Sequence, residues 1–163
     1  MSTFNKAFIL VDPKVLSIEA HSYHDAEEHL QWDASYSRDE VADDGRVVIG
    51  TLHGATKEAG FTVTIGSLFL NTGVVDTAAD YAIAVEGSEA LETLYDFCRH
   101  QAAAVVGMLG LTEKFDIPWK APEIEVSILE ERESASNDAQ GEDHDRTSDD
   151  TAHALGEQVS KTK

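Results

Sequence analysis

Residues 61–70 read Phe-Thr-Val-Thr-Ile-Gly-Ser-Leu-Phe-Leu, and this stretch decides the fold class. Its first five residues alternate apolar and hydroxyl side chains, the period of a strand with one face in a core and one in water. The same alternation occurs earlier in the chain, over residues 16–21 and 30–37. Residues 46–56 contain a further run with Val and Ile, which favours another strand.

Two turn signals separate the later strands. Asp43-Asp44-Gly45 precedes the strand at 46–56, and Lys57-Glu58-Ala59-Gly60 follows it. Gly and Asp tolerate the backbone angles of tight hairpins, so short turns should join neighbouring strands. The sequence therefore predicts a four-stranded antiparallel meander.

The apolar period changes after Gly87. From Leu91 to Leu109 the apolar residues fall three and four positions apart, the pattern of one helical face. Ser88 is a predicted N-cap, and Gly107 and Gly110 mark the expected end, which gives a helix of about 20 residues. Strands followed by a long helix define an α+β fold.

An extended segment should follow this helix. Pro118 and Pro122 exclude a regular helix there, and Ile124, Val126 and Ile128 alternate with polar residues.

The last residues differ in composition. Residues 130–163 hold ten acidic and four basic side chains, and their only large apolar residues are Leu155 and Val159. Such a segment cannot bury enough surface to offset its ordering entropy. We therefore expect an α+β domain over residues 1–129 and an acidic disordered tail over 130–163.

The chain is strongly acidic, with 31 acidic and 12 basic residues among 163 and a formal net charge of −19. This charge excludes nucleic-acid binding through phosphate contacts. No apolar run has the ~20 residues that span a bilayer, so no membrane insertion is expected. The single cysteine, Cys98, suits a reducing compartment, and residues 1–13 lack the pattern of a secretory signal. These features predict a cytoplasmic protein.

No catalytic motif is present, and we expect no catalytic residue, cofactor or metal. His21, His24 and Glu28 offer a metal-binding alternative, but their spacing matches no closed zinc pattern, and exposed surface residues are the simpler interpretation. Five large aromatic side chains are candidates for a polypeptide-binding groove, although they could also fill the core: Trp32, Tyr36, Phe69, Phe115 and Trp119.

The order of elements resembles the SecB-like export chaperones. Residues 16–20 are similar to the first strand of that family, residues 64–69 to its glycine-apolar-phenylalanine strand and residues 91–109 to its first long helix. Residues 115–124 resemble the proline-containing segment that covers its groove. Leu94-Tyr95-Asp96-Phe97-Cys98-Arg99 departs from the pattern of the family's helix, which fits a divergent member.

The resemblance implies one or two long helices packed on the sheet in the C-terminal part of the fold, and an ATP-independent chaperone. Such a protein binds unfolded or presecretory polypeptides in a hydrophobic groove and keeps them competent for export or folding. The implied partners are client polypeptides and an export motor ATPase. Uncovered sheet edges favour a homo-oligomer, a dimer or a tetramer. Two alternatives stay open: a SecB-like chaperone that serves a toxin–antitoxin pair, and a non-catalytic structural subunit of a larger assembly.

Overall fold

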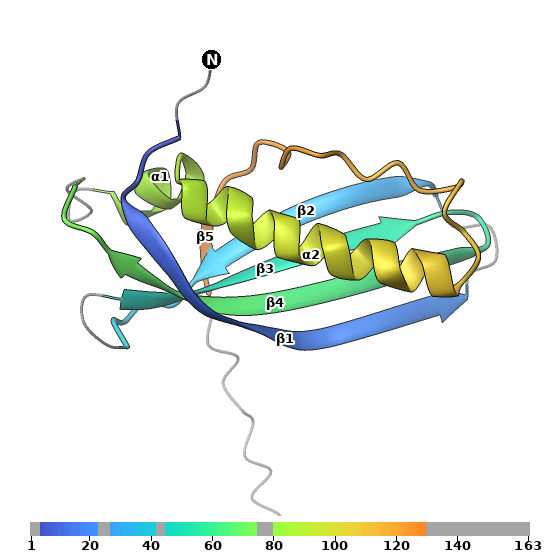
Figure 1. The fold of residues 1–163 in the computed structure, drawn as a ribbon, viewed down its shortest axis with the longest axis horizontal. Coiled ribbons are helices and arrows are strands. Elements are labelled where there is room, and N and C mark those ends of the chain that lie inside the picture. Colours follow the sequence, from blue (N-terminus) through green and yellow to red (C-terminus); the bar gives the residue numbers. More distant parts are fainter. Residues whose placement is uncertain (1–3, 23–26, 42–44, 75–79, 130–163) are drawn as a thin grey trace, which may run out of the picture. The chain divides into compact units, whose positions relative to one another are not determined.

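A computed structural model describes residues 4–22, 27–41, 45–74 and 80–129 (Figure 1). The predicted α+β class is confirmed, and the predicted tail at 130–163 lies outside the described residues. In chain order the elements are β1 (Phe8–Ser22), β2 (His29–Tyr36), β3 (Gly45–Ala55), β4 (Ala59–Asn71), α1 (Tyr81–Glu86), α2 (Glu89–Met108) and β5 (Ser127–Ile128).

The sheet is not the simple meander that the sequence predicts. Its strand order is β1-β4-β3-β2-β5. Strands β2, β3 and β4 follow one another as antiparallel neighbours, but β1 pairs with β4 instead of β2. This is the order of a Greek key. The fifth strand, β5, adds a two-residue parallel pairing to β2. Alternation identifies strands and their faces, but it carries no information on which strands become neighbours.

Strand β1 is longer than predicted because two irregularities interrupt its alternation. The register shifts between Val11 and Lys14 and again between Val15 and Ser17, and Asp12 has a positive φ of 53°. Each shift moves the next side chain to the opposite face, so the period of two is visible only from Leu16 onward. Pro13 is tolerated because β1 is an edge strand in the described part of the chain.

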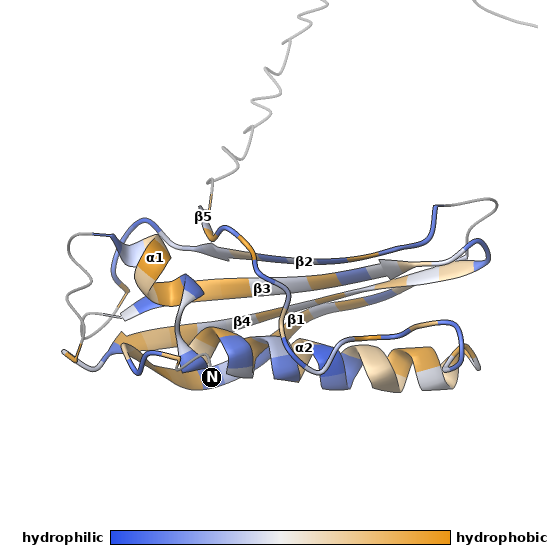
Figure 2. Ribbon diagram, turned by 90° about the horizontal axis from the view of Figure 1, so that it is seen from above, coloured by the Kyte–Doolittle hydropathy of each residue, from blue (hydrophilic) through white to orange (hydrophobic). Residues whose placement is uncertain are grey.

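Helix α2 covers one face of the sheet and forms the second layer of the fold (Figure 2). Ser88 caps it as predicted, since its Oγ accepts a hydrogen bond from the Leu91 amide at 3.1 Å. The helix ends at Met108, and Gly110 then adopts a positive φ of 70°. Its predicted stripe is buried against the sheet except for Leu109: Leu91, Leu94, Tyr95, Cys98, Ala102, Val105 and Val106.

The short helix α1 was not predicted, because six residues are too few to show a period. Asp80 caps it by accepting a hydrogen bond from the Ile83 amide at 3.2 Å. Tyr81, Ala84 and Val85 face the core.

Two glycines of β3 leave room for aromatic rings on the face beneath α2. A Cβ at Gly50 would lie 2.3 Å from the Trp32 ring, and a Cβ at Gly54 would lie 2.6 Å from the Phe61 ring. Both distances are far below van der Waals contact, so these strand positions have to be glycine for the rings to pack.

Candidate functional site

After α2 a segment of the chain runs back beside the helix, across the face of the sheet that α2 covers, and leads into β5 (Figure 1). We call residues 111–126 of this segment the strap. It forms no regular secondary structure, as its two prolines predict. Its apolar side chains pack against the core: Leu111, Phe115, Ile117, Ala121, Ile124 and Val126.

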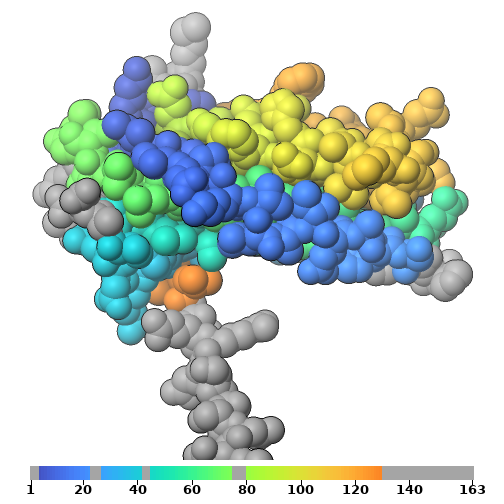
Figure 3. Space-filling model, turned by 60° about the horizontal axis from the view of Figure 1, so that its bottom comes forward, coloured from blue at the N-terminus to red at the C-terminus, as the bar shows by residue number. Residues whose placement is uncertain are grey.

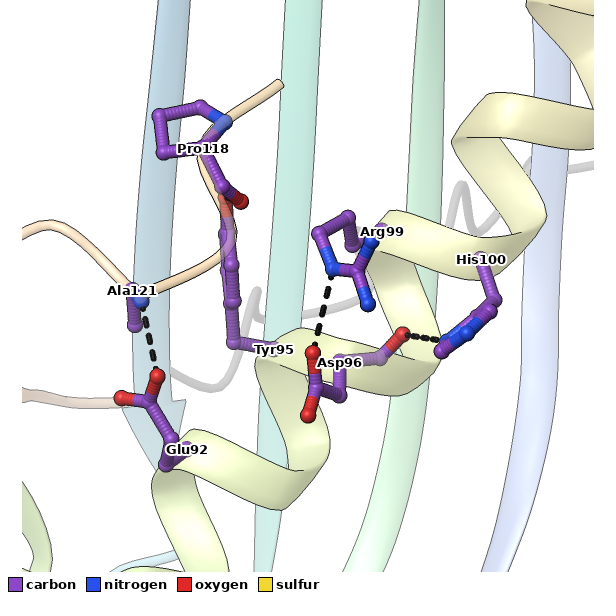
Figure 4. Close-up of polar contacts among 7 residues, drawn as sticks. All are labelled: Glu92, Tyr95, Asp96, Arg99, His100, Pro118 and Ala121. Atoms are coloured by element: carbon purple, nitrogen blue, oxygen red, sulfur yellow. Dashed lines mark hydrogen bonds and ion pairs between the residues drawn. The ribbon is translucent and has the colours of Figure 1, made fainter.

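Three side chains of the two helices hold the strap by its backbone. Tyr95 Oη donates a hydrogen bond to the Pro118 carbonyl at 2.7 Å, and Glu92 Oε1 accepts one from the Ala121 amide at 3.0 Å (Figure 4). Glu86 Oε1 accepts a third from the Val126 amide at 2.8 Å. Contacts of this kind recognise an extended backbone whatever its side chains are.

Tyr95 remains a donor at neutral pH. Burial raises the pKa of its hydroxyl to about 12, and the positive charge of Arg99 opposes that shift only in part. The hydrogen bond from Tyr95 to the Pro118 carbonyl, which we call the clasp, is therefore insensitive to pH in the physiological range.

Trp119 lies on the outer side of the strap, with 82% of its surface exposed. Its ring stacks on the guanidinium of Arg99, whose Cζ is 4.3 Å from the ring centroid. Arg99 is held in turn by Asp96, with 3.1 Å between Nε and Oδ1 (Figure 4). A large aromatic group is thus fixed on the surface instead of collapsing into the core.

A hollow of about 450 Å³ opens where the strap passes the end of α1 and the start of α2. Its apolar lining includes Phe4, Ile83, Leu91 and Ile124, and charged side chains border it: Glu86, Glu92, Lys120 and Glu123. Ile83 is 64% exposed, so this apolar surface faces solvent. The hollow is therefore a concave surface of mixed character, in which polar atoms contribute more of the exposed surface than apolar atoms.

The five groove candidates do not form one open groove, which corrects the interpretation of three of them. Trp32, Tyr36 and Phe69 are buried core residues, because their strand positions point beneath α2 and the strap. Phe115 is half-buried, with its ring edge-on to Phe61 at 5.2 Å. Of the five, Trp119 alone is exposed.

Trp32 nevertheless has an unusual environment. Its ring meets Tyr95 edge-on at 5.3 Å, below the strap. Its buried indole N–H has no hydrogen-bond partner among the described residues. A buried donor without a partner is costly, so this group would gain from any carbonyl that reached it.

The residues around the hollow were mostly missed at the level of sequence. Leu91 was assigned to the buried stripe, but Ile83 lies on the unpredicted helix α1, and Phe4 belongs to no periodic pattern. The signal that could have found the site was the pair Glu86 and Glu92, two acidic residues that lie two positions before and four positions after the Ser88 cap.

The metal alternative finds no support in the described residues, which contain no group of three His, Cys, Asp or Glu side chains that could hold an ion. His24 lies outside them. Cys98 is buried as predicted, and burial raises the pKa of its thiol to about 12.

Comparison with known proteins gives the class of fold. No protein-family model matches the chain, and no curated protein matches it. A solved structure does: the SecB-like chaperone of Mycobacterium tuberculosis in complex with a ChAD peptide from the HigA1 antitoxin. The match has a TM-score of 0.50 at 16% identity and covers 73% of this chain and 88% of that one.

The chain is thus similar in fold to a SecB-like chaperone at a distant level of sequence. Within its described part, no helix is both long and apolar enough to cross a membrane.

Proposed function

We propose that this chain is a cytoplasmic, ATP-independent chaperone that binds apolar segments of unfolded polypeptides. The observation that carries the proposal is the solvent-facing hollow with Phe4, Ile83 and Ile124 in its lining, beside a strap that already lies there as an extended peptide. The similar fold of a SecB-like chaperone supports it. This function needs no catalytic group.

The hollow and the exposed Trp119 are the contact points for a client in this proposal. An apolar client side chain would contact Phe4, Ile83 and Ile124, and an extended backbone would lie along the strap. Each buried aliphatic or aromatic side chain contributes about 1.5–3 kcal/mol. Association itself costs several kcal/mol, so several such contacts are needed and short peptides should bind weakly.

A second candidate function is service to a toxin–antitoxin pair. It is favoured by the structural neighbour, which was solved with an antitoxin peptide. In this form of the proposal the client is one antitoxin segment instead of many unfolded chains. Docking to an export motor ATPase is a further part of the proposal, and so is a homo-oligomeric state.

The test is suppression of aggregation of a permanently unfolded client, such as reduced α-lactalbumin, with the full chain and no ATP. We expect slower light scattering near a stoichiometric ratio. Ile83→Asp should weaken client binding about tenfold, because it places a charge in the apolar lining. Val74→Asp is the matched control, since Val74 is also exposed, at 72%, but lies outside the hollow. Unchanged aggregation with the wild-type chain would favour a structural subunit, and equal loss in both variants would remove the hollow as the site.

A further inference from the structure

One edge of β2 is free over most of its length in the described part of the chain. On its other edge β2 pairs with β3 over all eight of its residues. On the free edge its described partner is β5, which adds two parallel pairs, at Ser35 and Tyr36. Residues 29–34 have no described strand beside them on this side.

The hydrogen-bond pattern of β2 and β3 shows which backbone groups face the free edge. The Ser37 amide donates to the Val47 carbonyl at 2.8 Å, so these two residues form a hydrogen-bonded pair. In an antiparallel ladder such pairs recur at every second residue, and the odd-numbered residues of β2 therefore bond to β3. Leu30, Trp32 and Ala34 turn their N–H and C=O groups toward the free edge.

The contact with β5 shows that this edge accepts a strand. The Tyr36 carbonyl accepts a hydrogen bond from the Leu129 amide at 2.8 Å. Followed back along the chain, the same register would place Val126 opposite Ala34, but the pairing begins only at Ser127. The chain's own segment therefore leaves the rest of the edge unpaired.

The free edge is open at its start and covered near β5. Figure 2 looks onto this edge, and there the strap lies beside α2 for most of its length and reaches β2 only near β5. His29 and Gln31 are exposed, whereas Trp32 and Ala34 are only 3% and 5% exposed. No hydrogen bond from the described residues reaches the free-edge backbone groups of Leu30 or Trp32. Covered backbone groups without a partner are costly, so an added strand would stabilise this edge.

Strand β1, at the opposite edge of the sheet, is built differently. In the space-filling view β1 (blue) runs across the surface below α2 (yellow) with no other described element over it (Figure 3). It contains Pro13, and its register shifts at two places. Prolines and bulges are devices by which sheets prevent pairing at an exposed edge. Strand β2 contains neither, so its edge is the regular one.

We propose that the free edge of β2 binds an extended client segment as an added strand, the mode of recognition called β-augmentation. The inference rests on the proposed chaperone function and adds a second contact to it, made through the client backbone. The alternating donors and acceptors at Leu30, Trp32 and Ala34 match an extended backbone. Pairing begins at the exposed end of β2, and the strap moves aside as it proceeds toward β5.

The two faces of β2 determine which client segments fit best. Trp32 points beneath α2 and the strap, whereas Gln31 and Asp33 are exposed on the opposite face. Side chains of an added strand alternate between these faces. The preferred segment therefore alternates apolar and polar residues over about five positions. A segment with apolar residues three and four positions apart, the pattern of a helix, fits less well.

The test measures binding of a fluorescent synthetic peptide, in which valine alternates with threonine and lysine, to the full chain. Leu30→Pro removes one amide that faces the free edge and leaves the pairing with β3 intact. Leu30→Ala is the matched control, because it also loses the leucine side chain but keeps the amide. We expect the peptide to bind Leu30→Pro roughly fivefold more weakly than Leu30→Ala. A peptide of the same composition, with its valines three and four positions apart, should bind the wild type more weakly.

Hydrogen exchange of the wild type, read at single amides by NMR, is a second measurement that needs no variant. The peptide should slow exchange of the Leu30 and Trp32 amides at least about tenfold. The Gln31 and Asp33 amides already bond to β3 and should change little. This measurement decides the question if circular dichroism shows that Leu30→Pro does not fold.

Equal peptide affinity in the two folded Leu30 variants would overturn the inference. So would equal affinity for the two peptides, or protection confined to amides around the hollow. A wild type that suppresses client aggregation while the peptide protects no amide of β2 would remove this inference and leave the chaperone proposal standing. A wild type that suppresses no aggregation would remove the chaperone proposal itself.

Discussion

The hydrogen bond from the Tyr95 hydroxyl to the Pro118 carbonyl should control how often the strap opens. Tyr95→Phe removes the bond to the Pro118 carbonyl and leaves the ring packed against Trp32. A single neutral hydrogen bond contributes about 0.5–1.5 kcal/mol net. A loss of about 1 kcal/mol should make the open state roughly five times more populated.

Hydrogen exchange read by mass spectrometry measures this directly. The amides of Ala121 and Val126, which bond to Glu92 and Glu86, should exchange roughly fivefold faster in Tyr95→Phe. Amides in the centre of β3 and β4 should not change. For a client that binds the aromatic side chains beneath the strap, the apparent affinity of Tyr95→Phe should be roughly fivefold higher than that of the wild type.

Tyr81→Phe is the matched control. Tyr81 is also a buried tyrosine whose pKa is raised to about 12 by burial, but its hydroxyl has no hydrogen-bond partner among the described residues. Its removal should leave strap exchange unchanged. Equal exchange in wild type and Tyr95→Phe would refute the clasp. Faster exchange with unchanged client affinity would show that the strap opens but does not gate binding.

Three further predictions concern the core and its titrating groups. Gly50→Ala should lower the free energy of unfolding, measured in urea, by about 1–3 kcal/mol, because the added Cβ would clash with Trp32. Gly107→Ala should raise it by about 0.5–1 kcal/mol, because this position of α2 faces open space. A more stable Gly50→Ala than Gly107→Ala would contradict the packing. Burial and the neighbouring His29 and His21 lower the pKa of His53 below 6.5. As the pH drops below about 6.5 the unfolded chain therefore takes up the proton first, and the free energy of unfolding should fall. Denaturation across that pH range should show a smaller fall in His53→Gln. Cys98 should not react with iodoacetamide at neutral pH until the chain unfolds, because burial raises the pKa of its thiol to about 12. Rapid labelling of the native protein would show that this thiol is not buried.

Local pattern predicted most of the elements. The alternation at Phe61–Ile65 and the three-four spacing from Leu91 identified strand β4 and helix α2, and Ser88 was placed correctly as the cap. These features depend on neighbours in the sequence, where period and capping chemistry operate. The turn after β3 was predicted for the same reason, with Thr56 and Ala59 closing it through a backbone bond of 2.8 Å.

The features that were missed depend on contacts between distant residues. The pairing of β1 with β4 requires knowledge of the whole sheet. Trp32, Tyr36 and Phe69 are buried among residues that are distant in the chain, and their rings contact those of Tyr95, Tyr81 and Phe8 respectively. Aromatic content identified large side chains but could not say which ones the fold would cover. The hollow combines Phe4 with residues 83–92 and 120–124, which no local pattern connects.

The interruption of β1 has a consequence for the proposed chaperone function. Pro13 has no amide hydrogen, and the positive φ of Asp12 turns the backbone out of line at the outer edge of the sheet. An unfolded segment therefore finds no row of donors and acceptors that continues along the whole of β1, because the register shifts divide the edge into shorter pieces. A chaperone of the proposed kind must not template the conversion of its clients into fibrils, and the interrupted edge shortens the template that β1 offers.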